Sequence, residues 1–145
     1  MASVKSVAIT NLDAVPSVMG DGGNLSPMMV WHDTYEASSL ASGSDITIAR
    51  IPAGSTIHDV IVKADALGGS STLTVGDSGD ADRFLAAVGT WNAAGQAQSM
   101  LAGSTAANTA VAGLAYKVTS STDLVITTGG ATISGTIYFW VHYTQ

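Results

Sequence analysis

The sequence predicts an all-β protein, a single β-sandwich or jelly-roll-like domain preceded by an extended N-terminal arm, and three observations carry this prediction. Apolar and polar residues alternate along several short segments, as they do in half-buried strands. Clusters of Gly, Ser, Asn and Asp separate these segments about every 8–12 residues. No long window has the apolar spacing of a helix. This pattern indicates about seven to nine short strands, as in a sandwich or jelly roll.

Residues 1–44 differ from the rest of the chain and are predicted to form the arm. Pro16, the glycine-rich stretch 20–24 and Pro27 interrupt any longer element. The regular strand pattern begins at Asp45, so the sandwich domain is expected to span residues 45–145.

Two parts of the arm have strand character. Residues 4–12 fit one short strand, and residues 28–35 fit an edge strand, after which residues 38–44 are expected to loop into the domain. Apolar side chains at the start of the second segment are candidate anchors on a partner, since Met fills irregular gaps well. These anchors are Met28, Met29, Val30 and Trp31.

The next strands follow in quick succession. Residues 46–50 alternate, with Ile46, Ile48 and Arg50 on one face, and residues 57–66 alternate with Val60, Val62, Ala64 and Ala66 on one face and Ile61 and Lys63 on the other. A Gly-Gly-Ser-Ser turn separates the second of these from a strand at 72–75, and residues 84–88 fit a strand or a short helical turn. The succession from residue 60 to residue 85 predicts a β-meander.

An acidic turn is the most specific signal in the sequence. Asp77, Asp80 and Asp82 precede Arg83 within a few residues. They could bind a hard cation such as calcium, but the spacing differs from that of an EF-hand loop. We favour a structural role, in which the aspartates accept hydrogen bonds from turn amides and Arg83 pairs with one of them.

The C-terminal region ends in the bulkiest strand. Residues 89–115 predict a long ordered loop with one or two weak strands, and strands follow at 115–119, 123–128 and 135–144. In the last, both faces carry large side chains: Ile137, Phe139, Val141 and Tyr143 on one, and Tyr138, Trp140 and His142 on the other. Such a strand lies at the centre of a sandwich or against another subunit. We therefore expect Tyr138 and Trp140 to contact a partner.

Composition excludes several classes of protein. The 145-residue chain fits one domain, and only 11% of its residues are charged, a surface suited to burial against neighbouring subunits. A net charge of −6 with five basic residues argues against nucleic-acid binding. Neither a signal peptide nor an apolar run long enough for a membrane span is evident, so we expect no membrane partner. Without cysteine, disulfides and thiolate metal sites are excluded.

No catalytic, cofactor-binding or metal-binding residue is predicted, and the protein is not expected to be an enzyme. Glu36 is the sole glutamate, and the aspartates lie mostly at turns, so a glycosidase-type carboxylate pair is not indicated. His32, His58 and His142 are far apart and lack metal-ligand spacing. Gly-x-Ser-x-Gly and Gly-x-Gly-x-x-Gly motifs are both absent.

Several segments resemble those of small virion structural proteins of tailed bacteriophages. They are IPAG at 51–54, ALGGSSTLTVGD at 66–77, DADRFLAA at 80–87, TTGGA at 127–131 and GTI at 135–137. The resemblance covers roughly residues 45–145 and implies a head decoration (cement) protein. Such a protein would be made in the host cytoplasm and bind the major capsid protein on the outer surface of the virion capsid, as a homo-oligomer, most simply a homotrimer.

A second function stays open at this point, a phage fibre or tail accessory protein that binds host surface glycan. An aromatic-lined groove would suit it, although packing in the core or between subunits explains the same residues. The aromatic set is Trp31, Tyr35, Trp91, Tyr138, Trp140 and Tyr143, with Trp91 and Trp140 the expected glycan contacts.

Overall fold

A computed structural model describes residues 27–89, 96–101 and 113–145. Nine strands and no helix occur in these ranges, so none of them holds a helix long and apolar enough to cross a membrane. The strands are β1 Met29–Leu40, β2 Asp45–Ile51, β3 Thr56–Ala64, β4 Thr72–Asp77, β5 Asp80–Val88, β6 Gln96–Ser99, β7 Tyr116–Lys117, β8 Thr122–Gly129 and β9 Ile133–Thr144.

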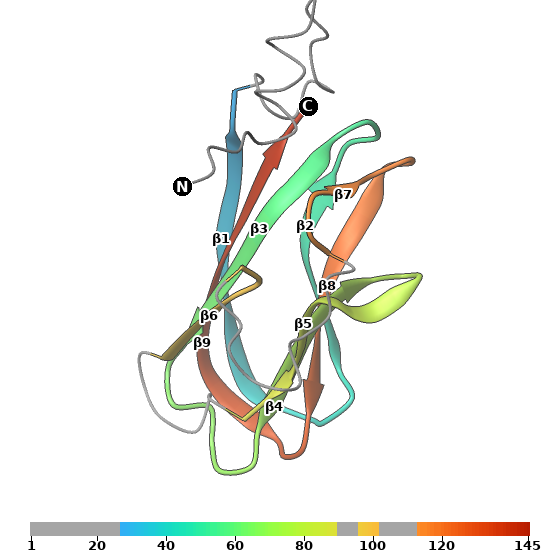
Figure 1. Ribbon diagram of the computed structural model, residues 1–145. Coiled ribbons are helices and arrows are strands. Elements are labelled where there is room, and N and C mark those ends of the chain that lie inside the picture. The colour runs from blue at the N-terminus through green and yellow to red at the C-terminus, as the bar shows by residue number, and fades with distance from the viewer. Residues whose placement is uncertain (1–26, 90–95, 102–112) are drawn as a thin grey trace, which may run out of the picture.

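The strands form two antiparallel sheets packed face to face, which confirms the predicted all-β sandwich (Figure 1). Sheet A has the order β1-β9-β3-β6, with the short β7 also paired to β3, and sheet B has the order β2-β8-β4-β5. The first described strand, β1, lies beside the last, β9, in sheet A. Along the chain, successive strands pass repeatedly from one sheet to the other, as in a jelly roll. Among the described strands, β1 and β2 are the edge strands on one flank of the sandwich.

The core fills the space between the sheets. Each of its fully buried apolar side chains stabilises the fold by about 1.5–3 kcal/mol relative to an exposed one. The largest are Phe84, Ile51, Ile57, Leu73, Leu124, Ile126, Ile133, Ile137, Val60, Val62 and Val75. Alternation in β9 agrees with the sequence: Ile137, Phe139 and Val141 are buried, whereas Tyr138 and Trp140 are half-buried on the outer face.

The predicted β-meander is wrong. β3 belongs to sheet A and β4 to sheet B, so the turn at residues 65–71 carries the chain from one sheet to the other. Of the strands in the described residues, only β4 and β5 form a hairpin within one sheet. The alternation of β3 and β4 reports which face of each strand is buried, and both bury a face in the same core without pairing with each other.

A β-bulge changes the pattern in β2. Ile46 and Ile48 are buried as predicted, but the register with β8 shifts between Thr47 and Ala49. As a result Arg50 is exposed and Ile51 is buried, so Arg50 does not share the core face with Ile46. The bulge inserts one residue and reverses the parity of every residue after it.

Several other elements differ in length or type from the expectation. The edge strand predicted at 28–35 is present as β1 but continues to Leu40, where a loop was expected. β7 has two residues, not the five predicted at 115–119. Residues 84–88 continue β5 as strand. Residues 4–12 and Trp91 lie outside the described ranges, and so does most of the predicted loop 89–115, within which β6 is seen.

Candidate functional site

Antiparallel pairing of β1 with β9 brings most of the predicted partner-binding residues to one edge of sheet A (Figure 1). Met29, Val30 and Trp31 lie in β1, and Tyr138 and Trp140 lie in β9. Met28 immediately precedes β1 and is 61% exposed. Their role in binding a partner stays a prediction.

The register divides these residues between two faces. Trp31 lies opposite Val141, which is fully buried, so Trp31 projects on the inward side of the sheet. Val30 lies opposite His142, and both project outward with Tyr138 and Trp140. Trp31 is nevertheless 40% exposed, because β1 is an edge strand and its inward side is not fully covered by sheet B.

The outer face of sheet A carries a cross-strand row of large side chains. Trp140 is the register partner of His32 on β1 and of Ile61 on β3, and Tyr138 is the partner of Lys63 on β3. We call this surface the outer aromatic face, after Tyr138 and Trp140. Sequence reasoning missed His32, Ile61 and Lys63 as its members. Alternation in β3 placed Ile61 and Lys63 on one side, but nothing local in the sequence showed that this side adjoins Trp140.

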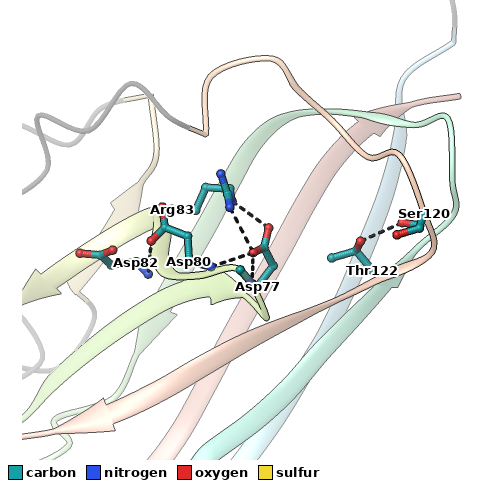
Figure 2. Close-up of polar contacts among 7 residues, drawn as sticks. Asp77, Asp80, Asp82, Arg83, Ser120 and Thr122 are labelled. Carbon is teal, nitrogen blue, oxygen red and sulfur yellow. Dashed lines mark hydrogen bonds and ion pairs between the residues drawn. The ribbon is translucent and has the colours of Figure 1, made fainter.

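The acidic turn joins β4 to β5 and is built around one buried carboxylate (Figure 2). Asp77 Oδ1 accepts hydrogen bonds from the backbone N–H of Gly79 at 2.8 Å and of Asp80 at 3.0 Å. Arg83 Nε donates to Asp77 Oδ2 at 2.8 Å. The side chain of Asp77 is 4% exposed and that of Arg83 is 18% exposed. The predicted structural role of this turn is confirmed.

Arg83 connects the turn to the aromatic part of the core. Its guanidinium carbon lies 4.5 Å from the ring centre of Tyr116, a cation–π contact. Tyr116 in turn packs edge to face on Phe84, with ring centroids 5.8 Å apart and planes inclined at 79°. The hydrogen bond from Arg83 to Asp77 raises the pKa of the guanidinium. β4, β5 and β7 are therefore held together by one chain of contacts.

Of the other two aspartates of the turn, Asp80 is half-buried and Asp82 is exposed. The backbone N–H of Asp82 donates to Asp80 Oδ1 at 3.4 Å, and hydrogen bonding to the Asp80 side chain raises the pKa of Asp82 above its usual range. Within the described ranges, no group of three or more His, Asp or Glu side chains is placed to hold a metal ion. Both carboxylate oxygens of Asp77 already accept hydrogen bonds, from Arg83 and from two backbone amides, so the geometry favours the structural role over a cation site.

Gly76 is required where the backbones of β4 and β5 approach each other closely. A Cβ added here would overlap the backbone of Asp80 and Ala81, which cannot rotate away as a side chain does. We expect Gly76→Ala to lower the free energy of unfolding by about 1–3 kcal/mol, measured by urea denaturation. Gly69→Ala is the matched control, because a Cβ there meets nothing within 4 Å. Equal stability of both variants would contradict the requirement for glycine at position 76.

A hollow of ≈700 Å³ lies between the acidic turn and the outer face of sheet B. Arg50 and Asp123 form a bidentate ion pair in its lining, with N–O distances of 2.6 and 2.9 Å, which lowers the pKa of Asp123. The lining is Asp45, Arg50, Gly76, Asp77, Ser78, Ala81, Ser120, Ser121, Thr122, Asp123, Val125 and Thr127. None of these is aromatic, so the hollow lacks the ring platform expected of a glycan groove.

Comparisons with known proteins reveal the same fold in phage capsids. The chain is similar to a chain of the "Cyanophage Pam1 capsid asymmetric unit", with a TM-score of 0.68 and 22% identity over 99% of both chains. A chain of the "Capsid of Ralstonia phage GP4" matches with a TM-score of 0.62 and 16% identity, over 82% of this chain and 84% of that one.

The acid-stable capsid of Helicobacter pylori bacteriophage KHP30 contains a third similar chain. It matches with a TM-score of 0.60 and 12% identity, over 81% of this chain and 87% of that one. No protein-family model and no curated protein matches the sequence. At these identities the three likenesses establish a shared fold.

Proposed function

We propose that this protein is a non-enzymatic capsid decoration (cement) protein that binds the outer surface of a phage head as a homotrimer and stabilises it. The observation that carries the proposal is the match to a cyanophage capsid chain over 99% of both chains. Because so little of either chain lies outside the alignment, the two chains have nearly the same length and align almost from end to end. Two further phage capsids contain similar chains, which supports a place on the head rather than on a fibre.

The surface of the molecule supports a docking role. The outer aromatic face presents Tyr138 and Trp140 half-buried, with Ile61 and His32 beside Trp140. Tyr and Trp are enriched among the residues that dominate binding energy at protein interfaces. With 11% charged residues overall, the chain also has the charge depletion of an interface core. We assign this face to contact with the major capsid protein.

A trimer on a threefold or quasi-threefold axis would contact several capsomers at once. Modest contacts then add through their high effective concentration, and the shell is tied together against internal pressure. The arm was predicted to span residues 1–44, and its β1 segment forms part of sheet A. The residues before β1 would add contacts with a neighbouring copy or with the shell, at an entropic cost.

The test is an add-back experiment on heads assembled without this chain. Purified protein should co-sediment with such heads at saturation and raise the temperature at which they release DNA. Removal of residues 1–27 should lower the occupancy of the heads. Binding to host cells or to a glycan array, with no binding to heads, would support a fibre or tail role and overturn the proposal.

Trp140→Ala is expected to weaken head binding by at least about tenfold, because truncating an aromatic anchor in an interface typically costs about 2 kcal/mol or more. Val125→Ala is the matched control, since Val125 is a half-buried apolar residue on the outer face of sheet B. Titration of labelled protein onto heads measures both variants. A loss with Val125→Ala and none with Trp140→Ala would place the docking face on sheet B.

A further inference from the structure

The edge of β1 that faces away from β9 is long. β1 pairs with β9 from Met29 to Ala37 without a register shift, and no described strand lies on its other side. Every side chain from Val30 to Glu36 is exposed. Proteins usually shield such an edge with lysine, proline, a bulge, a short strand length or an inward-pointing charge, and over its first nine residues β1 has only the last of these, Asp33. An edge of this kind is a template for an added strand.

A groove runs along the inward side of this edge. It has a volume of ≈360 Å³ and lies between Trp31 and Asp33 of β1 and residues 47–50 of β2. Tyr35, on the same side of β1, is 36% exposed. A strand added to β1 would send alternate side chains into this groove and cover both aromatic rings.

Charge argues against a second β1 as the added strand. Asp33 and Glu36 are the charged residues of β1, and it has no lysine or arginine. Two β1 strands side by side would bring the two Asp33 carboxylates near each other on the inward face and the two Glu36 carboxylates near each other on the outward face, which is unfavourable. The occupant should therefore be an extended segment with apolar alternation and a positive charge.

Residues 4–12 of this chain have that composition. Val7 and Ile9 alternate with small or polar residues, and Lys5 supplies the positive charge opposite the acidic edge. Residues 13–28 connect the segment to β1 and can span at most about 53–58 Å when extended. A 16-residue connection is much longer than ordinary hairpin loops of about 2–5 residues, which disfavours a hairpin between residues 4–12 and β1 of the same chain. The same length allows residues 4–12 to reach β1 of another copy.

We propose that residues 4–12 of one copy add as a strand to the free edge of β1 of a second copy, with Val7 and Ile9 in the groove beside Trp31. The inference rests on the homo-oligomer of the proposed function and names the contact that holds it. Exchange of a terminal strand between copies is a low-cost route to a closed oligomer.

The cysteine-free chain allows a direct test by disulfide crosslinking. Two differently tagged full-length chains are co-expressed, one with Thr34→Cys in β1 and the other with Ser6→Cys, Ala8→Cys or Thr10→Cys. These positions share the outward face if Val7 and Ile9 point inward. After mild oxidation, at least one pair should crosslink between chains about tenfold more than the same arm cysteine paired with Ala53→Cys, an exposed turn residue.

A second variant keeps the test independent of folding. Val7→Asp with Ile9→Asp should abolish the crosslink and the oligomer, as measured by analytical ultracentrifugation, while the sandwich unfolds as in the parent chain. Crosslinking only between two Thr34→Cys chains, or at none of the three arm positions, would overturn the proposal. No phage head is present, so this failure is distinguishable from a failure to bind heads.

Discussion

Replacing Asp77 with alanine is expected to lower the free energy of unfolding by about 3 kcal/mol, near the lower end of the range for removing one partner of a buried ion pair. The substitution leaves Arg83, only 18% exposed, without its carboxylate. It also removes the acceptor of the Gly79 and Asp80 amides, which hold the turn. Urea denaturation followed by circular dichroism gives the change.

Two further variants define the origin of this loss. Asp77→Asn should be less damaging than Asp77→Ala, since an amide oxygen can still accept the turn hydrogen bonds although it carries no charge for Arg83. Asp123→Ala breaks the Arg50–Asp123 pair, whose side chains are 70% and 40% exposed, and should change stability little because solvent and salt screen it. Equal losses in Asp77→Ala and Asp123→Ala would contradict a special role for the buried pair.

Phe84→Ala is expected to be at least as damaging, with a loss of about 3–5 kcal/mol. Phe84 is the largest fully buried side chain in the described part of the chain, and it packs edge to face with Tyr116. Removing its ring leaves a cavity between β5 and β7 and takes away the surface on which Tyr116, and through it Arg83, is positioned. Thermal and chemical unfolding both report the change.

Leu114→Ala is the comparison for this second result. Leu114 is 44% exposed, and surface truncations typically change stability by less than about 0.5 kcal/mol. If Phe84→Ala were no more harmful than Leu114→Ala, the contacts from Asp77 through Arg83 to Phe84 would not stabilise the hairpin as described.

Much of the fold could be predicted because strand alternation is a local property. The residues of β9 divided correctly into a buried set with Phe139 and a half-buried set with Trp140. The turn chemistry of Asp77 and Arg83 was also predicted, since these residues lie within six positions of each other. Both features depend on residues that are close in the sequence.

Pairing between distant strands could not be predicted in this way. Which of Val30 and Trp31 faces the core depends on the register of β1 with β9. This register pairs residues far apart in the sequence: Glu36, for example, accepts a hydrogen bond from Thr136, 100 residues away. The assignment of β3 and β4 to different sheets depends on the same kind of long-range contact. For the candidate site, alternation identified the exposed aromatics, whereas the neighbours of Trp140 required the three-dimensional pairing.

The position of β9 between β1 and β3 has a consequence for biosynthesis. The β4–β5 hairpin joins strands separated by a short turn and can form early on an emerging chain. β1 must wait for residues 133–144 before it gains a neighbour in its sheet. A nascent chain that stops short of this segment has no outer aromatic face, so incomplete translation products would be unable to compete with finished copies for a place in an assembly.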